Sequence, residues 1–413
     1  MAFAPRRRVR SIWRYFRAEQ RTLRQGVAAL VLGTVAAFVA GITLGSITGT
    51  LAKLPGLIIL IPAVLSMRGT IFGAVGARLA TSTHAGIFEV TMARTGVLYQ
   101  NVFVSIVLVV SSSLYLAVLA KVSAIAFGLK SIRLLDLVTI SVVGGIADSA
   151  IVLVLTVGLA VLCYRRGYDL DAVSTPIVTA VADMVTVPMI YVASLLVRFR
   201  TPSTILAVLC ILLGIYAVIR GALTELRLAR RILLEMTLVV LLTPLLDILA
   251  GTVVESRLDR FVAFPGLLVL VPPFVAGAGS LGGILASRLS SKLQLGLVSP
   301  RGFPESAALL DGGLTMGFSV VVFTLTGALG LAFSVVAGKA YPGAGVMLWG
   351  TLSAGLLATV IAIVFSYYIA ILTSRFGLDP DNHSVPIITS VMDLAGIVVF
   401  LLVLAAFGVN VGG

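Results

Sequence analysis

The sequence contains few of the side chains that build most soluble metal sites and active sites. It has two histidines, two cysteines and two tryptophans in 413 residues, and only 11% of its residues are charged. Cys163 and Cys210 fall in different apolar segments with no CxxC pair nearby, which excludes a disulfide framework and a thiolate metal site as expectations. His84 and His383 lie near the ends of apolar segments, and no HExxH or GxSxG motif is present. An intramembrane enzyme is therefore not expected.

Apolar residues dominate instead, at 59% of the chain. Several apolar runs are long enough to cross a bilayer as helices, which is typical of a polytopic membrane protein. The sequence predicts an all-α protein with eleven transmembrane helices, near residues 26–48, 56–83, 98–125, 134–163, 173–198, 203–221, 232–254, 266–293, 308–337, 344–372 and 383–408.

The charge balance is basic, with a formal net charge of +13. Eight arginines fall in the segment 1–25, before an apolar run too long for a cleaved signal peptide, so we expect a basic cytoplasmic tail. Because the basic residues flank apolar segments, anionic lipid headgroups are the expected partner and nucleic acid is not. A cytoplasmic amino terminus places about 20 of the 30 Lys and Arg inside, which favours an N-in, C-out protein of the plasma membrane.

Two pairs of stretches repeat at a fixed distance along the chain. GYDLDAVSTPIVTAVAD (167–183) matches GLDPDNHSVPIITSVMD (377–393), and LPGLIILIPAVLSMRGTIFGAVGARL (54–79) matches FPGLLVLVPPFVAGAGSLGGILASRL (264–289). In both pairs the numbers of the second stretch exceed those of the first by 210, and we call this constant difference the repeat offset. Its regularity indicates an internal duplication.

Each copy contains five predicted spans, and the segment 203–221 has no counterpart. Because such a connector itself crosses the membrane, the second repeat enters in the same orientation as the first. The sequence thus predicts two parallel repeats about a pseudo-twofold axis along the membrane normal, with one chain acting as a monomeric pseudo-dimer. The expected units are the tail, the first repeat, the connector and the second repeat, at 1–25, 26–200, 201–228 and 229–413.

The predicted spans contain few charges, and these are mostly acidic. One base, Arg68, stands among five carboxylates, namely Asp148, Asp183, Asp247, Asp311 and Asp393. An ionised group costs at least about 2.5 kcal/mol at the bilayer centre even on the mildest scale. We therefore expect the aspartates to face a polar cavity, which would favour cations.

Asp183 and Asp393 are the most informative of these residues because both copies carry them. Each lies about eleven residues into its predicted helix, or roughly 16 Å at 1.5 Å per residue, near the middle of a ~30 Å hydrocarbon core. Thr179 and Thr389 precede them by one helical turn, on the same face. The pattern predicts that both pairs line a central cation path. A protonated structural role for the two aspartates is the alternative.

Other polar residues leave two interpretations open. Asp169, Asp171, Asp379 and Asp381 would stand at the cytoplasmic mouth of the path, or would only complement the positive end of a helix. Asn101 and Asp311 match each other in the third helix and would line the path or bond neighbouring helices. Asp148 and Asp247 match Ala358 and Ala37, so neither is symmetric. Arg78 and Arg288 are expected to act as cytoplasmic anchors or to hold the second helix.

These features together resemble the MgtE magnesium transporters over nearly the whole chain beyond the basic tail. The resemblance rests on two five-span repeats, on P-x(6)-P-x(6)-G at each second helix, and on S-x-P-x-x-T-x-x-x-D in each fifth helix. It implies two five-helix units around a cation path, here in one duplicated chain as in the related animal solute carriers. The family's pore aspartate falls on Asp183 and Asp393.

The sequence departs from the family in two places. The short segment 1–25 precedes the first predicted span, so gating by the family's cytoplasmic N and CBS domains is not carried over. The family's Gly-Asn turn is replaced by Gly69-Thr70 and Gly279-Ser280. Arg68, beside the first turn, would oppose a cation in the path, so we predict that it pairs with a buried aspartate.

The leading function is transport of a divalent cation, with secondary transport of a cationic organic solute as the alternative. Few aromatic residues lie among the aspartates, which favours an inorganic ion. Carboxylates and hydroxyls without His or Cys suit Mg²⁺ better than Zn²⁺ or Cu⁺. We therefore expect Mg²⁺ as the transported ion and no organic cofactor.

Overall fold

The computed structural model of the chain describes residues 20–166, 170–300, 303–376 and 380–409. Every regular element in these ranges is helical. The elements are α2 (Gln20–Ser46), α3 (Thr48–Lys53), α4 (Leu57–His84), α5 (Val97–Ala126), α6 (Leu134–Arg166), α7 (Leu170–Leu195), η1 (Leu196–Arg198), α8 (Arg200–Ala222), α9 (Arg227–Glu255), α10 (Leu258–Ala263), α11 (Pro265–Gln294), α12 (Ser306–Val336), η2 (Val346–Gly350), α13 (Thr351–Arg375) and α14 (Pro380–Ala406).

Eleven helices in the described ranges are long and apolar enough to cross a membrane. They coincide with the eleven predicted spans, so this part of the prediction is confirmed. The long runs of apolar residues determine this outcome, because a helix needs about 20 of them to cross the hydrocarbon core. The predicted first span ended at 48, whereas α2 ends at Ser46 and a separate short helix, α3, follows.

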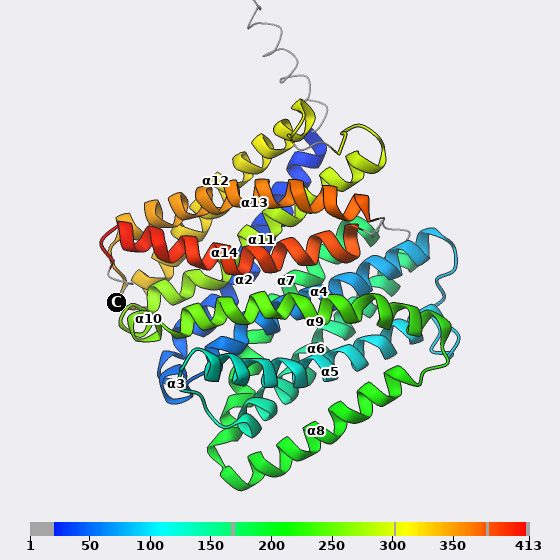
Figure 1. Cartoon of the computed structure of the whole chain (residues 1–413), viewed down its shortest axis with the longest axis horizontal. Helices are drawn as coiled ribbons and strands as arrows, with labels where there is room; N and C mark the ends of the chain where they lie inside the picture. The colour runs from blue at the N-terminus through cyan, green and yellow to red at the C-terminus, as the bar shows by residue number, and fades with distance from the viewer. Residues whose placement is uncertain (1–19, 167–169, 301–302, 377–379, 410–413) are drawn as a thin grey trace, which may run out of the picture.

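The short helices α3 and α10 reveal the duplication in three dimensions. α3 covers positions 48–53 and α10 covers positions 258–263, so the repeat offset that relates the sequence stretches also relates these helices. Figure 1 shows α3 and α10 at the same end of the helix bundle. Corresponding elements of the two repeats therefore face the same way, and the prediction of parallel repeats is confirmed.

The first helix of each repeat packs against the second helix of the other repeat. α2 lies against α11, and α9 lies against α4. Glycine makes each crossing close: a Cβ on Gly41 would overlap the carbonyl oxygen of Val269, and one on Gly251 would overlap that of Ile59. The two contacts correspond residue for residue under the repeat offset. The repeats are thus interlocked by the same contact made twice.

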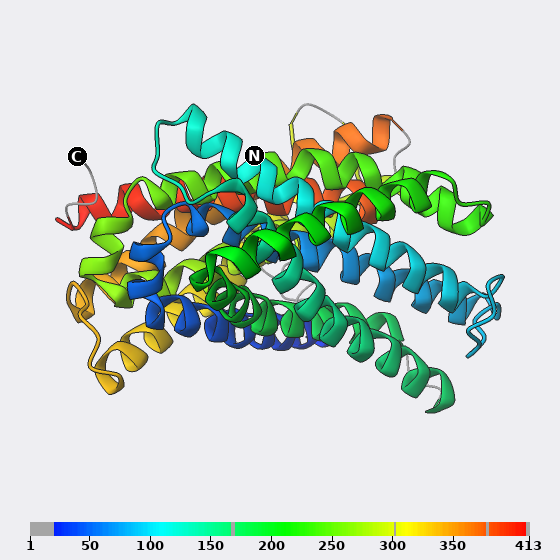
Figure 2. The same cartoon turned by 90° about the horizontal axis from the view of Figure 1, so that it is seen from below.

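The unpaired helix α8 lies at the edge of the bundle. It packs on α5 and α6 of the first repeat and stands on the face turned to the viewer in Figure 2. Many of its large apolar residues are exposed in the protein alone, as expected for a surface that meets lipid. The connector therefore carries the chain across the membrane without entering the interface between the repeats.

We expect Gly251→Ala to lower the apparent melting temperature of the purified protein. The added methyl group would press on the carbonyl of Ile59, and overpacking of this kind costs about 1–3 kcal/mol. Gly158→Ala is the matched control, because a Cβ at Gly158 meets nothing within 4 Å. Equal melting temperatures for the two variants would contradict the close crossing.

Candidate cation site

Asp183 and Asp393 occupy equivalent positions in α7 and α14. Each lies thirteen residues after the first residue of its helix, or about 20 Å along a helix that rises 1.5 Å per residue. This depth is compatible with the middle of the membrane, since the hydrocarbon core is about 30 Å thick. Asp183 is half-buried and Asp393 is buried.

The two threonines of the predicted site pack against glycines of the second helices. A Cβ on Gly69 would lie 3.6 Å from Thr179, and a Cβ on Gly279 would lie 3.5 Å from Thr389. The hydroxyl of Thr389 donates a hydrogen bond to the carbonyl of Pro386 at 2.9 Å. Its oxygen lone pairs stay available to a cation or its water shell. Gly69 and Gly279 of the second helices therefore border the fifth helices.

The carboxylates of Asp183 and Asp393 interact electrostatically across the two repeats. In the described part of the chain neither residue takes part in an ion pair. Two negative charges near each other in a low-dielectric interior repel strongly unless a cation or a proton compensates them. The structure thus places the two predicted site residues within electrostatic range of each other, with no ion pair to either among the described residues.

Asp247 of α9 is the third acidic residue at this place. Its side chain is fully buried, and neither carboxylate oxygen is in hydrogen-bond geometry with any described residue. Asp393 and the hydroxyls of Ser66 and Ser390 lie close enough to Asp247 to influence its carboxyl group. Ser66 also lies beside Asp393. The second repeat therefore places two carboxylates next to each other where the first repeat places one.

These acids do not form a single three-carboxylate centre. The described residues contain no group of three or more His, Cys, Asp or Glu side chains placed to hold one metal ion. An ion between Asp183 and Asp393 would have to complete its shell with hydroxyl oxygens and water. Mg²⁺ suits this arrangement because it usually keeps several waters when it binds to a protein.

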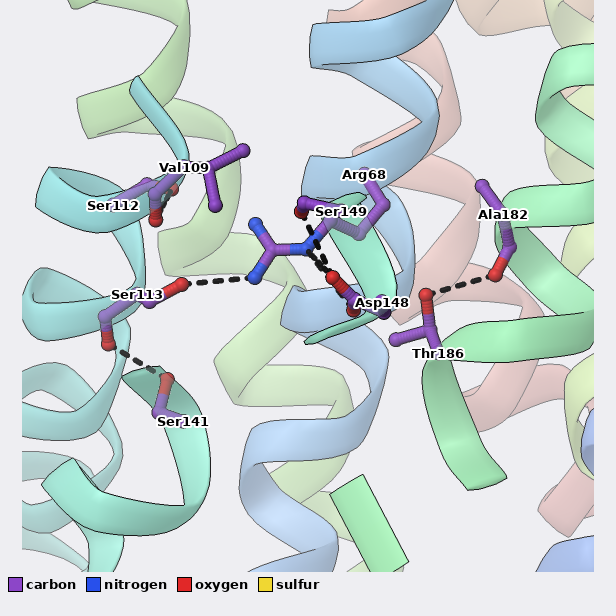
Figure 3. A network of polar contacts seen from close by, with 9 residues as sticks. All are labelled: Arg68, Val109, Ser112, Ser113, Ser141, Asp148, Ser149, Ala182 and Thr186. Atoms are coloured by element: carbon purple, nitrogen blue, oxygen red, sulfur yellow. Dashed lines mark hydrogen bonds and ion pairs between the residues drawn. The ribbon is translucent and has the colours of Figure 1, made fainter. Parts of the chain in front are cut away.

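Arg68 of α4 reaches into a network of polar side chains within the first repeat, which Figure 3 shows. Its Nε donates to both carboxylate oxygens of Asp148, at 3.0 and 3.1 Å, and its Nη2 donates to the Ser113 hydroxyl at 2.8 Å. Both charged side chains are fully buried. The predicted pairing of Arg68 with a buried aspartate is confirmed, and the partner is Asp148.

The same network joins three further helices to α4. Ser149 donates a hydrogen bond to Asp148 at 2.8 Å, and Ser141 of α6 donates to the carbonyl of Ser113 in α5 at 2.7 Å. Thr186 of α7 lies beside Asp148. The positive charge of the guanidinium is thus neutralised within the first repeat and does not oppose a cation at the pseudo-twofold axis.

Asn101 and Asp311 form matching contacts between the second and third helices. Asn101 accepts a hydrogen bond from Arg78 at 2.9 Å. Asp311 pairs with Arg288 at 3.0 Å and with Lys292 at 2.6 Å. These contacts support the interhelical alternative for both residues, and the lining of the cation path by Asn101 and Asp311 stays a prediction.

We expect Asp311→Asn to be tolerated. Asparagine stands at the equivalent position of the first repeat, where it bonds Arg78, so the substitution copies an arrangement that the chain already uses. Divalent-ion uptake into proteoliposomes should stay within about threefold of wild type, since the amide oxygen can still accept a hydrogen bond from Arg288 and only the bond from Lys292 is lost. A loss of uptake in well-folded protein would instead support a direct role in the path.

The side chains of the four shallow acids lie outside the described part of the structure. Asp169 and Asp379 lie outside the described residues. Asp171 and Asp381 belong to the first turns of α7 and α14, but their side chains are outside the described part of the structure. Their expected place at the mouth of the path stays a prediction.

The sequence of this chain matches the family model described as "MgtE: Divalent cation transporter" over residues 61–193 and again over 271–403. The two matches begin and end at positions related by the repeat offset, so they are the two repeats. The chain belongs to the MgtE family of divalent cation transporters. The resemblance inferred from the fifth-helix and second-helix motifs is confirmed.

Two mammalian proteins are similar in sequence to this MgtE-family chain over most of its length. "Solute carrier family 41 member 3" from Rattus norvegicus is 23% identical over 372 residues, which are 82% of this chain and 77% of the relative. The Mus musculus protein of that name is also 23% identical, over 82% of this chain and 73% of its own length. No solved structure matches the chain.

Two parts of the site were missed by sequence reasoning. Ser66 and Ser390 were not singled out, and Asp247 was recognised as buried but not as a neighbour of Asp393. A signal was present: under the repeat offset Asp247, Ser66 and Ser390 correspond to Ala37, Ala276 and Ala180. Positions that are polar in one repeat and alanine in the other would have identified this group.

Proposed function

We propose that this protein transports Mg²⁺ across the membrane along a path between α7 and α14, at the interface of the two repeats. The observation that carries the proposal is the pair Asp183 and Asp393. These acids are equivalent in the two repeats, lie deep in their helices, interact with each other and have no ion pair in the described structure. A divalent cation would neutralise both carboxylates at once.

The donor set supports Mg²⁺ over softer metals. The groups available are carboxylates with the hydroxyls of Thr179 and Thr389, and hard cations prefer such oxygen ligands. The described residues offer no three-carboxylate centre, which favours an ion held largely through its water shell. Asp169, Asp171, Asp379 and Asp381 would concentrate cations at the cytoplasmic entrance.

The remaining features follow from the same proposal. The chain acts as a monomer whose two repeats replace the subunits of a dimer, with its amino terminus in the cytoplasm and the plasma membrane as its location. It is a transporter and not an enzyme. The units proposed from the sequence, 1–25, 26–200, 201–228 and 229–413, are kept.

The test is uptake of divalent ions by the purified protein in liposomes that contain a Mg²⁺-sensitive dye. We expect Mg²⁺ entry that depends on the protein, with Mn²⁺ competing for the same path. Metal-dependent thermal stabilisation, measured with a panel of divalent ions, should rank Mg²⁺ and Mn²⁺ above Zn²⁺. Dye signals equal to those of protein-free liposomes for all these ions would overturn the proposal.

A further inference from the structure

Two buried carboxylates lie next to each other at the junction of α9, α14 and α4. Asp247 is 0% exposed and Asp393 is 7% exposed. The two groups lie close enough for the charge of each to act on the other, and the hydroxyl of Ser66 lies beside both. Ionised groups in such a place are strongly destabilising unless they are compensated.

Other buried aspartates of the described chain have a basic partner. Asp148 pairs with Arg68, Asp136 pairs with Arg133, and Asp311 pairs with Arg288 and Lys292. Asp247 and Asp393 pair with none in the described structure, and both oxygens of Asp247 lack a hydrogen bond there. Among these buried aspartates, only Asp247 and Asp393 therefore lack a basic residue that would neutralise their charge in the described structure.

Ser390 gives an independent indication that the group receives a ligand. Its side chain is fully buried, and its hydroxyl oxygen has no hydrogen-bond partner in the described structure, although it lies beside Asp247. A bare proton shared by two acids does not require additional hydroxyls around it. A hard metal cation does, because it binds several oxygen atoms.

The pseudo-twofold axis does not repeat the polar residues around Asp247, because alanine stands at the equivalent positions. The positions equivalent to Asp247, Ser66 and Ser390 are Ala37, Ala276 and Ala180. Ala37 is 1% exposed and Ala180 is 4% exposed, so the first repeat buries small apolar side chains at the equivalent positions. A structural need common to both repeats would not produce this difference.

We infer that Asp247, Asp393, Ser66 and Ser390 form a second binding position for the transported divalent cation, displaced from the axis toward α9. This inference rests on the proposed function. Asp393 belongs to both positions, and no three acids in the described structure hold one ion together. A divalent ion therefore occupies the axial position between Asp183 and Asp393 or the displaced position, and moves between them by exchanging Asp183 for Asp247.

The test compares Asp247→Asn with Asp183→Asn in the full-length protein, with Mn²⁺ as the probe. Free Mn²⁺ is measured by electron paramagnetic resonance in detergent, and Mn²⁺ uptake is measured in proteoliposomes. For Asp247→Asn we expect half-saturating Mn²⁺ to rise and uptake to fall by about tenfold or more, since a bond to a charged group is lost. Asn has nearly the shape of a protonated aspartate, so the variant would behave like the wild-type protein if Asp247 only carried a proton. Wild-type binding and uptake in Asp247→Asn would therefore overturn the inference.

Serine variants provide a test that leaves all carboxylates in place. Ser390→Ala should raise half-saturating Mn²⁺ by about threefold, as expected for one neutral hydroxyl ligand. The control Ala180→Ser adds a hydroxyl at the equivalent position of the first repeat and should leave binding unchanged. If Asp247→Asn does not yield folded protein, unchanged binding in Ser66→Ala/Ser390→Ala overturns the inference.

The outcome is separable from that of the proposed function. Loss of uptake in Asp183→Asn together with normal uptake in Asp247→Asn would leave the axial path standing and remove only the displaced position. Wild-type uptake in both variants would reject the axial path as well.

Discussion

Replacing both Asp183 and Asp393 by asparagine should abolish divalent-ion uptake while the protein still folds. Asparagine nearly preserves the shape of the side chain but removes the charge. Each bond to a charged group contributes about 1.5–3 kcal/mol, so the double variant should transport at least about a hundredfold more slowly than wild type. Initial rates of Mg²⁺ entry into proteoliposomes measure this directly.

Removing the paired charges should also affect stability in a way that depends on the ion. A ligand at a hundred times its dissociation constant stabilises the folded protein by about 2.7 kcal/mol. The double variant should therefore lose most of the Mg²⁺-dependent rise in melting temperature, and its melting temperature without metal should not fall. Asp311→Asn is the control because that acid is matched by Arg288 and Lys292. Wild-type uptake in the double variant would show that the ion path lies elsewhere.

The spans and the duplication could be predicted from the sequence because the membrane restricts both. Each crossing demands a long apolar helix, and a repeated unit leaves repeated residues such as Pro55 and Pro265 at a constant spacing. The short helices α3 and α10 were not predicted, since a helix of six residues contains too little of the 3.6-residue period to be distinguished from a turn.

The contacts of buried charges were harder to predict. Position along a helix gives the depth of a residue such as Asp247, but not which faces of separate helices meet. Here α9 packs both on α14 of its own repeat and on α4 of the other, and this crossing brings Ser66 to Asp247 and Asp393. Arg68 could be assigned an aspartate partner on energetic grounds, but several buried aspartates were candidates, and only the packing of α4 on α6 selects Asp148.

The two repeats fill the position of Arg68 in opposite ways. The first repeat has a buried ion pair there, whereas the second has an aromatic ring between small side chains. Under the repeat offset Arg68, Ser113 and Asp148 correspond to Ala278, Phe323 and Ala358.

A glycine of the fourth helix makes room for the large side chain in each repeat. A Cβ on Gly145 would overlap the Arg68 guanidinium. A Cβ on the equivalent Gly355 would overlap the Phe323 ring. Phe323 in turn packs on Phe274, with ring centroids 4.9 Å apart. An ion pair and an aromatic cluster thus serve as alternative cores at equivalent places.

This equivalence leads to a prediction for Asp148. In Asp148→Asn the Arg68 guanidinium stays buried and loses its counter-charge, and breaking a buried pair in this way costs about 3–5 kcal/mol. We expect a large fall in melting temperature and in the yield of folded protein. The double variant Arg68→Ala/Asp148→Ala copies the alanines of the second repeat and leaves a cavity but no buried charge, so it should be more stable than Asp148→Asn.

The comparison becomes quantitative as a double-mutant cycle over Arg68→Ala and Asp148→Ala. Because the two side chains are in direct contact, the cost of the double variant should be smaller than the sum of the two single costs. Adding Ser113→Phe fills the cavity with the residue type that the second repeat uses beside Gly355, and should recover part of the remaining loss. The melting temperatures of the four variants measure this coupling. Strictly additive losses of stability in the two single variants and the double variant would mean that Arg68 and Asp148 do not stabilise each other. The charge of Arg68 would then be compensated by another group.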